Sequence, residues 1–138
     1  MTLRVPNVGE VKMLENVLNK TAPENQILKL FRSNTTPADT DTHTTYTEAT
    51  FTGYTAITLT GTNWTVTSGD PTEAAYAQQT FASTAGSQNQ SIYGYYVTQA
   101  SSGVLMWAER FTDGPYTIVN NGDEIRITPK LTLADTLD

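Results

Sequence analysis

The sequence predicts a mainly β fold: an antiparallel β-sandwich of jelly-roll type with one N-terminal helix. Threonine, which favours strands over helices, makes up roughly a fifth of the residues. Short strand-like segments recur at a spacing of about 8–12 residues, as in sandwiches. Only one segment has a convincing helical pattern. These observations predict a single domain over residues 1–138, with an arm and a helix in residues 1–24 and the sandwich in residues 25–138; an open barrel is the alternative.

The segment "PNVGEVKMLENVLNK" predicts the helix. Asn7 is its expected N-cap, Glu10 follows three residues later as in a capping box, and Pro23 prevents continuation. The helix carries one apolar stripe, formed by Val8, Val11, Leu14 and Leu18. Two interpretations stay open: the stripe packs on the protein's own sheet, or it docks on another subunit.

The middle of the chain predicts strands separated by polar connections. The segment "NQILKLFRS" is the first strand, and residues 33–45 follow as a long polar loop. Three threonine-interleaved pieces come next, "YTEATFTGY", "TAITLTG" and "NWTVTSG", of which the first is a strand, a bent helical segment or an irregular segment. The segment "AAYAQQTFAST" then predicts one further strand, and the polar "AGSQNQS" predicts a connection.

The stretch "IYGYYVTQASSGVLMWAERF", residues 92–111, predicts a hairpin that turns at "ASSG". Strand alternation places Leu105, Trp107 and Phe111 on the core face of the second strand. It places Val104 and Met106 on the opposite face. Because both faces are apolar, a second sheet, the helix or a neighbouring subunit is expected to cover the outer one.

Two dipeptides in the C-terminal part, Asp113-Gly114 and Asn121-Gly122, predict hairpin turns. Behind the second turn, strand alternation separates an apolar face from a polar face. The apolar face consists of Ile125, Ile127, Leu131 and Leu133, and the polar face of Glu124, Arg126, Thr128, Lys130 and Thr132. Pro129 has no N–H to donate to a ladder, so it predicts an edge position or a bulge.

Charge and composition exclude several classes of function. The net charge is −6 at pH 7 and there is no run of Lys or Arg, which argues against binding to nucleic acid or to an anionic membrane surface. The chain has no cysteine, so disulfides, cysteine-ligated zinc and thiol catalysis are excluded. The N-terminus lacks the apolar segment of a signal peptide, and no apolar run has the length of a membrane-spanning helix.

No motif in the sequence predicts catalysis or a bound cofactor. His43, the only histidine, alternates with Asp39 and Asp41, so an extended strand would place the three side chains on one face as weak metal ligands. No further ligand accompanies them, and a solvated polar loop is the simpler interpretation. Neither a serine–histidine–acid arrangement nor a pair of carboxylates is marked by its surroundings. We therefore expect no enzymatic activity, no metal site and no cofactor.

Polar and aromatic residues of the predicted strands leave further alternatives open. Glu109 is expected to form a salt bridge or hydrogen bond at the end of its strand, or to contact another chain. Aromatic side chains at strand spacing form either core and interface or a platform for a sugar. The residues concerned are Trp64, Tyr93, Tyr95, Tyr96, Trp107 and Tyr116.

The segment "IYGYYVTQASSGVLMWAERFTDGPYTIVNNGDEIRITPKLTLAD" resembles the C-terminal half of small virion proteins of tailed phages. Such proteins carry an aromatic-Gly-aromatic strand and a turn, then a strand like "WAERF", then "GPYTI", and finally a Gly-containing turn before a strand like "ITPKLTL". The upstream "YTEATFTGY" is similar to a second block of these proteins. The resemblance implies a structural component of a virion that is assembled in the host cytoplasm, and it brings no catalytic residues to this chain.

Within that class, the resemblance implies a head decoration, or cement, protein that stabilises the capsid by binding the major capsid protein and copies of itself, as a dimer or trimer. The alternative is a module of a tail or fibre that binds a receptor or a glycan. For the first role, the helix stripe, the arm "MTLRVP" and the doubly apolar strand supply a candidate subunit or capsid interface. Its residues are Leu3, Val5, Val11, Leu14, Val104, Met106 and Arg110. Neither nucleic acid nor a membrane is an expected partner.

Overall fold

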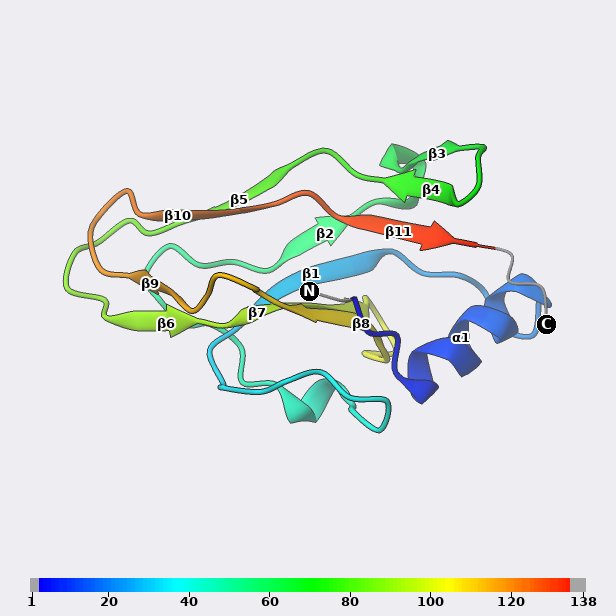
Figure 1. Cartoon of the computed structure of the whole chain (residues 1–138), viewed down its shortest axis with the longest axis horizontal. Helices are drawn as coiled ribbons and strands as arrows, with labels where there is room; N and C mark the ends of the chain where they lie inside the picture. The colour runs from blue at the N-terminus through cyan, green and yellow to red at the C-terminus, as the bar shows by residue number, and fades with distance from the viewer. Residues whose placement is uncertain (1–2, 135–138) are drawn as a thin grey trace.

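A computed structural model of the chain describes residues 3–134 and shows mainly antiparallel β-structure with one α-helix (Figure 1). The mainly β class and the N-terminal helix are therefore confirmed. The elements are α1 (Asn7–Val17), β1 (Gln26–Phe31), the 3-10 helix η1 (His43–Thr45), β2 (Ile57–Leu59), the 3-10 helix η2 (Gly61–Asn63), β3 (Thr65–Thr67), β4 (Thr72–Ala75), β5 (Gln79–Ala82), β6 (Gln90–Ile92), β7 (Gly94–Gln99), β8 (Leu105–Arg110), β9 (Tyr116–Ile118), β10 (Glu124–Ile127) and β11 (Lys130–Leu133).

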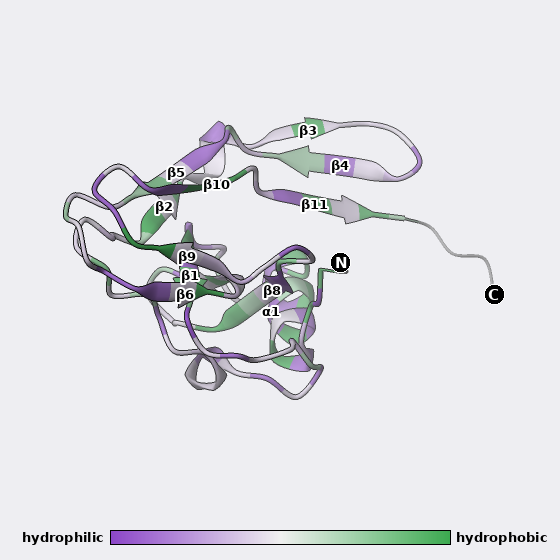
Figure 2. Cartoon of the chain, turned by 60° about the vertical axis from the view of Figure 1, so that its left-hand side comes forward, coloured by the Kyte–Doolittle hydropathy of each residue, from purple (hydrophilic) through white to green (hydrophobic). Residues whose placement is uncertain are grey.

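The strands form four antiparallel sheets, with the orders β2-β1-β7-β8, β11-β4-β3, β10-β5 and β6-β9. The sheets are arranged in two layers (Figures 1 and 2). One layer contains β1, β7 and β8 together with β6 and β9, and the other contains β3, β4 and β11 together with β5 and β10. All six residues of β7 are buried, so this strand lies at the centre of the structure.

The main core lies between the two layers and draws its buried residues from three of the four sheets, while the partly buried Leu131 of the β11-β4-β3 sheet packs against it. Strands β1, β7 and β8 contribute Leu28, Val97 and Trp107, and strands β5 and β10 contribute Phe81 and Ile125. Burial of this apolar surface is the principal stabilising contribution. The full set is Leu28, Leu30, Ala49, Phe51, Leu59, Tyr76, Phe81, Ile92, Tyr95, Val97, Met106, Trp107, Ile118, Ile125 and Ile127.

A second, smaller cluster covers the opposite face of the β1-β7-β8 sheet, and it is formed by the chain itself. Phe31 and Tyr96 project from this face, and Tyr46, which follows η1, packs over both of them. The ring centroid of Tyr46 lies 4.8 Å from that of Phe31 and 5.1 Å from that of Tyr96. The long polar loop predicted at residues 33–45 therefore leads an aromatic side chain onto the outer face. Leu105 and Ala108 complete the cluster.

A β-bulge in β8 changes which residues face which cluster. Val97 pairs with Trp107 and Thr98 pairs with Leu105, so Met106 is the extra residue between them. Met106 and Trp107 both enter the main core, whereas Leu105 lies in the outer cluster. The predicted faces of Leu105 and Met106 are therefore wrong, because a bulge interrupts the period of two on which the prediction depended. Val104, also predicted on the outer face, packs against the main core.

The two Gly-containing turns exist, but neither closes a hairpin. Gly122 has a φ of 92°, the left-handed conformation that glycine adopts easily. The strands on either side of it do not pair with each other: β9 pairs with β6, and β10 pairs with β5. Likewise, the chain passes from β8 through Asp113-Gly114 to β9 without pairing these two strands. The dipeptides predicted where the chain turns, whereas burial between layers determines the strand pairs.

Two segments that were predicted as single strands are each divided in two. The segment predicted at residues 74–84 contains the end of β4 and the whole of β5, and residues 124–133 form β10 and β11. The two interruptions face each other, since the Tyr76 N–H donates to the carbonyl oxygen of Pro129 at 2.9 Å. Pro129 lies between the two ladders; the prediction of an edge position or a bulge at this proline did not anticipate that the strand is interrupted there.

Three tyrosine hydroxyls donate to carboxylates at the margins of the core. The pairs are Tyr46 with Asp41 at 2.7 Å, Tyr54 with Glu48 at 2.8 Å and Tyr95 with Glu109 at 2.7 Å. The hydrogen bond predicted for Glu109 is therefore present. Burial raises the pKa of all three phenols well above the usual value, and the carboxylate partner raises it further. For Tyr54, the Leu30 N–H that donates to its oxygen partly offsets this rise in pKa.

Alkaline solution is expected to destabilise the fold. In the unfolded chain these phenols ionise near their ordinary pKa of about 10, whereas the pKa of Tyr46, Tyr54 and Tyr95 in the fold is higher. The folded state therefore holds more protons above that pH. The contribution of these phenols to the free energy of unfolding is fully present below about pH 10, and it is lost as the pH rises toward their pKa in the folded state. Urea midpoints measured across a pH series should fall above about pH 10; a midpoint that stays constant there would contradict this expectation.

Replacement of Trp107 by alanine should destabilise the protein by about 3–5 kcal/mol, the usual cost of truncating a large buried aromatic residue. Trp107 is 2% exposed, and its ring lies in a T-shaped arrangement with Trp64. The matched control is Tyr116→Ala, which removes an exposed ring and should cost much less. Urea denaturation of both variants measures the difference. Equal losses of stability would show that the main core does not depend on Trp107.

Candidate interaction surface

Helix α1 is held against β8 by its N-terminal half. Gly9 is buried where the helix crosses the strand, and a Cβ atom at this position would overlap the carbonyl oxygen of Met106. Only glycine permits so close an approach of two backbones. One turn further along, Met13 packs against the main core. The side of the helix that contains Gly9 and Met13 is therefore its docking face.

The helix begins at a proline cap, and not at the predicted Asn7 cap. Pro6 is the N-cap residue and has extended backbone, and no side chain caps the helix. The carbonyl oxygen of Pro6 accepts hydrogen bonds from the N–H groups of Gly9 and Glu10. The N–H of Asn7 donates to the carbonyl oxygen of Asp39 at 2.8 Å. Asn7 is thus the first helical residue, and its backbone N–H is hydrogen-bonded to the 33–45 loop.

The N-terminal arm packs on its own chain from Leu3 onward. Arg4 forms an antiparallel bridge with Ala108, with two N–O distances of 2.9 Å, and so covers the outer edge of β8. The Arg4 guanidinium also forms an ion pair with Asp39 at 3.0 Å. Leu3 and Val5 are partly buried against the main core. The described part of the arm therefore does not extend toward a neighbour; Met1 and Thr2 lie outside the described residues.

The apolar stripe of α1 faces away from the sheet. Val11, Leu14 and Leu18 are 57%, 62% and 67% exposed. Because successive helical residues turn by roughly 100°, these three side chains lie on the side opposite Gly9. The interpretation that the stripe packs on the protein's own sheet is therefore wrong. Its docking on another subunit stays a prediction.

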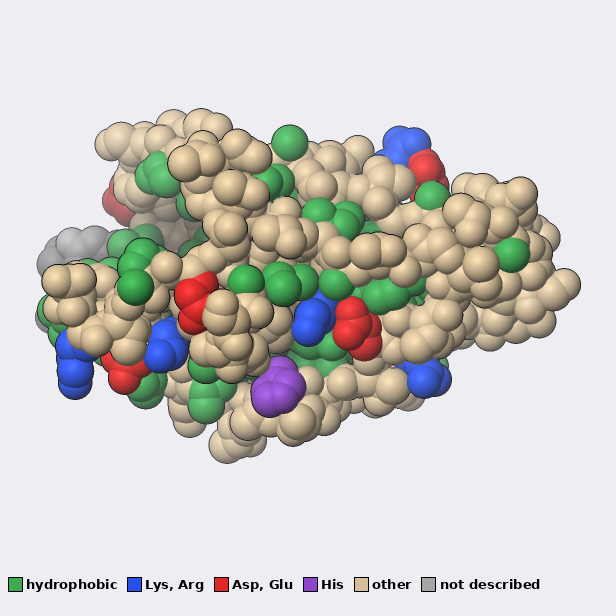
Figure 3. All heavy atoms as spheres, turned by 180° about the vertical axis from the view of Figure 1, so that it is seen from behind, with side chains coloured by type: hydrophobic (Ala, Val, Ile, Leu, Met, Phe, Trp, Pro, Cys, Tyr) green, Lys and Arg blue, Asp and Glu red, His purple; other side chains and the backbone are tan. Residues whose placement is uncertain are grey.

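This exposed stripe belongs to the largest group of exposed apolar side chains in residues 3–134. Five of the eight large apolar side chains that are exposed there lie on α1 or at its C-cap. We call these five the α1 patch: Val8, Val11, Leu14, Val17 and Leu18. The helix lies at one end of the molecule beside β8 (Figure 1), and on the reverse face apolar and charged side chains lie side by side at that end (Figure 3). Grouped exposed apolar residues of this kind are typical of interaction sites.

The predicted interface residues divide into accessible and inaccessible ones. Val11 and Leu14 belong to the α1 patch, whereas Leu3, Val5 and Val104 are partly buried against the main core. Met106 is 2% exposed, so a neighbouring subunit cannot reach it in this conformation. The patch also contains Val17, which the sequence prediction missed because Val17 lies beside the stripe and not in it.

Arg110, the last of the predicted interface residues, is engaged within the chain. Its guanidinium lies 5.1 Å from the centre of the Tyr93 ring. Its two terminal nitrogens donate to the carbonyl oxygen of Thr35 at 3.0 Å and to Asn34 Oδ1 at 2.7 Å. Arg110 thus attaches the 33–45 loop to β8. An intermolecular contact by Arg110 would have to compete with these bonds.

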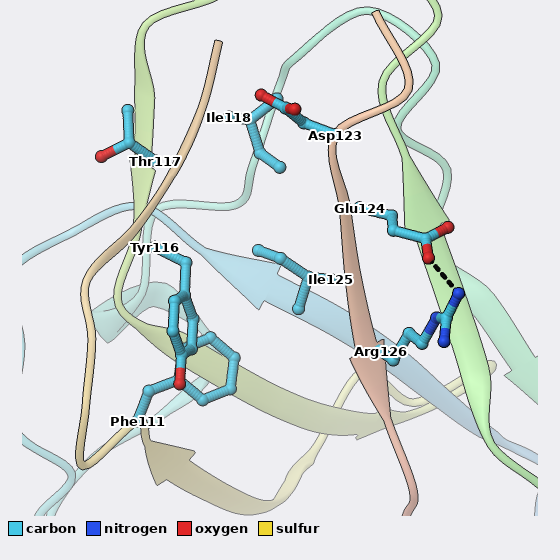
Figure 4. Close-up of a pocket in the computed structure, with 8 residues that line it drawn as sticks. All are labelled: Phe111, Tyr116, Thr117, Ile118, Asp123, Glu124, Ile125 and Arg126. Atoms are coloured by element: carbon cyan, nitrogen blue, oxygen red, sulfur yellow. Dashed lines mark ion pairs between the residues drawn. The ribbon is translucent and has the colours of Figure 1, made fainter. Parts of the chain in front are cut away.

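A shallow groove lies between β9 and β10 (Figure 4). Ile118 and Ile125 point into it from the two strands, and the Tyr116 ring lies against that of Phe111, with 5.1 Å between the centroids. At its far side Glu124 and Arg126 form an ion pair. The groove is thus apolar at its base, and its charged side chains already have partners.

Asp123, at the upper end of the same groove, stabilises the turn between β9 and β10. Its carboxylate accepts hydrogen bonds from the N–H groups of Asn120 at 2.7 Å and Val119 at 2.9 Å. These donors lower the pKa of Asp123, with Asn120 as the larger cause. The carboxylate therefore serves the local turn, and it is not a free group for ligand binding.

The aromatic residues considered as a sugar platform do not share a surface. Tyr95, Tyr96 and Trp107 are buried in the two clusters. Trp64 and Tyr93 are partly buried, and Tyr116 alone among the six is exposed. The interpretation as core residues is therefore confirmed for most of them, and a single exposed ring remains.

The Asp39, Asp41 and His43 side chains do not converge. Asp39 pairs with Arg4, and the buried Asp41 accepts hydrogen bonds from the Tyr46 hydroxyl and from the N–H of Ala38. His43 is exposed at the start of η1 (Figure 3). Within residues 3–134, no group of three histidine or acidic side chains is placed to hold a metal ion. The alternation predicted a shared face, but the segment turns into η1 and is not an extended strand.

Comparison with known proteins gives no relative. No protein-family model matches the chain, and neither a curated protein nor a solved structure matches it. No helix in the described part of the chain is long and apolar enough to span a membrane.

Adjacent residues of α1 provide a test of its orientation. Met13→Ala should lower the free energy of unfolding by about 1 kcal/mol or more, because Met13 packs against the core. Leu14→Ala should change it by less than about 0.5 kcal/mol, since Leu14 is mainly exposed and alanine favours helix. Urea denaturation of the two variants measures both values. A larger loss for Leu14→Ala would mean that the stripe is the docking face.

Proposed function

We propose that the protein is a structural component of a phage virion: a head decoration, or cement, protein that binds the major capsid protein and copies of itself. It acts through contact surfaces, without catalysis and without a cofactor. The sequence resemblance to small phage virion proteins supplies the class. In this proposal the two-layered β-structure is a sandwich of the jelly-roll type, and the protein resides on the virion.

The observation that carries the proposal is the α1 patch. A helix anchored through Gly9 and Met13 presents Val11, Leu14 and Leu18 to solvent. Exposed apolar surface on an anchored element is costly unless a partner covers it. A capsid shell offers the same complementary site many times, so a patch of modest size is sufficient for attachment.

The electrostatic properties of the chain agree with this role. A net charge of −6 with few charged residues disfavours nucleic acid and anionic lipid as partners. Within the described residues, the salt bridges are single pairs at or near the surface, such as Lys12 with Glu15 on α1 itself. Such pairs contribute little stability and leave the apolar patch as the distinctive surface of the helix.

Shell binding tests the proposal directly. Shells of the cognate phage prepared without this protein should bind the wild type and withstand higher temperature as a result. Val11→Asp with Leu14→Asp should lower the affinity for shells at least about ten-fold, because two charges would have to be buried at the contact. Co-sedimentation measures binding, and circular dichroism confirms that the variant is folded.

The control for this experiment is Leu133→Asp, which places the same charge at an apolar residue exposed to 79% outside α1. This variant should bind shells like the wild type. Equal binding by the helix variant and the wild type would contradict a role of the α1 patch. Absence of binding by the wild type itself would contradict the decoration role.

A receptor- or glycan-binding module of a tail or fibre is the second candidate, and the groove beside Tyr116 is the observation that favours it. The exposed Tyr116 ring above Phe111 offers one stacking surface. Under this alternative, virions would carry few copies of the protein, and Tyr116→Ala would reduce adsorption to cells without affecting the shell. That pair of results would replace the decoration role.

A further inference from the structure

The outer edge of β3 is an open strand edge. β3 pairs with β4 on one side, and no strand of the described chain pairs with its other side. All three of its side chains are exposed. Between Thr60 and Gly69 the sequence contains neither a charged residue nor a proline. β3 is short, at three residues, and shortness is one way in which proteins protect an edge; it carries no charge, proline, bulge or covering segment, the other devices that stop an open ladder from recruiting further strands.

Three other strand edges of this molecule, those of β8, β10 and β11, carry such devices. Arg4 covers the edge of β8 through its bridge with Ala108. β10 presents the ion-paired Glu124 and Arg126, and β11 carries Lys130 directly after a proline. The absence of all these devices at β3 therefore distinguishes this edge from them.

The edge is also held firmly in place. Trp64, immediately before β3, contacts Tyr76 and Trp107 in T-shaped arrangements, with centroid distances of 5.2 and 6.3 Å. The Tyr76 hydroxyl in turn accepts hydrogen bonds from the Thr60 N–H at 3.1 Å and from Asn63 Nδ2 at 3.3 Å. Because β3 is already ordered, pairing with a second strand requires little further loss of conformational entropy.

An apolar row leads from the core to this edge. Val66, Ala74 and Leu131 are aligned across β3, β4 and β11. Leu131 packs against the main core, whereas Val66 is 68% exposed. β3 lies at the outer rim of its layer, away from the layer that contains β1 and α1 (Figure 2). A strand added to β3 would therefore extend the row and cover Val66.

We infer that β3 pairs with β3 of a second copy, antiparallel, about a two-fold axis at Val66. The sequence Thr-Val-Thr reads the same in both directions, so this pairing sets Val66 opposite Val66 of the partner subunit. Thr65 then lies opposite Thr67 of the partner subunit. Cross-strand pairs of threonine and of β-branched residues are favourable, and a two-fold contact is closed. The result is a sheet that is continuous across two copies.

The contact is weak in dilute solution and strong only where copies are concentrated. A three-residue ladder buries far less than the roughly 1,600 Å² of a standard interface. On an assembled surface the local concentration of neighbouring copies is high, and weak contacts then add. The inference names the surface for the self-association that the proposed function includes. Its test uses the concentrated protein without shells. A negative result there does not affect the prediction of shell binding, and failure of shell binding does not affect this test.

The chain contains no cysteine, which allows a clean cross-linking experiment. In Val66→Cys, pairing about the two-fold axis brings two sulfurs close enough for a disulfide. With oxidised glutathione, two thiols lose two protons and two electrons, and two molecules of reduced glutathione form. Disulfide dimers should appear at least about ten-fold faster than for the control Leu133→Cys, since pairing raises the local thiol concentration. Leu133 is the more exposed residue, so random collision predicts the opposite order.

The register is tested with two further variants. Thr65→Cys mixed with Thr67→Cys should give the mixed dimer, whereas each variant alone should cross-link slowly, because antiparallel pairing sets 65 opposite 67. Rapid cross-linking of Thr65→Cys with itself would overturn the two-fold register. Equal rates for Val66→Cys and Leu133→Cys would overturn self-pairing altogether. Circular dichroism of each variant establishes that it is folded.

Discussion

The bulge at Met106 is the constraint on which the rest of the structure depends. A regular β8 would send alternate residues to opposite faces, but the extra residue brings both Met106 and Trp107 into the main core and leaves Leu105 for the outer cluster. The strand can therefore supply two apolar clusters at once. The carbonyl oxygen of Met106 is also the group against which Gly9 lies, so the bulge and the position of α1 are linked.

The seating of α1 explains why its stripe is exposed. Close contact with the backbone of β8 requires the small side of the helix, and Gly9 is the residue that provides it. Because the side of α1 that contains Gly9 packs against β8, the larger Val11 and Leu14 on the opposite side face outward. The outer face of the β1-β7-β8 sheet, meanwhile, is covered by Tyr46, and the N-terminal arm pairs with the edge of β8 at Arg4. Apolar surface is thus left open on the helix and not on the sheet.

Local chemistry in the sequence predicted the element types well and their partners poorly. The β-class and the helix followed from threonine content and helical spacing, whereas the missing N–H of Pro129 indicated an edge position or a bulge and not the end of a strand. The faces on which the β8 side chains lie could not be predicted, because an apolar run contains no sign of a bulge. The direction of the α1 stripe could not be predicted either. A periodic apolar stripe predicts an amphipathic helix, but it does not show that the opposite side of the helix, which contains Gly9, packs against the sheet. Strand pairs such as β9 with β6 depend on burial between distant segments.

The two open surfaces of the molecule have complementary properties. The α1 patch is apolar and belongs to a helix beside β8, whereas the β3 edge offers backbone hydrogen bonds from the other layer. A partner that covers one leaves the other accessible, so a single copy would contact a shell through its helix and a neighbouring copy through β3. Each contact is small, and small contacts permit correction of misplaced copies before a lattice closes. Their strength would arise from simultaneous engagement, because the second contact forms at the high effective concentration that the first one creates.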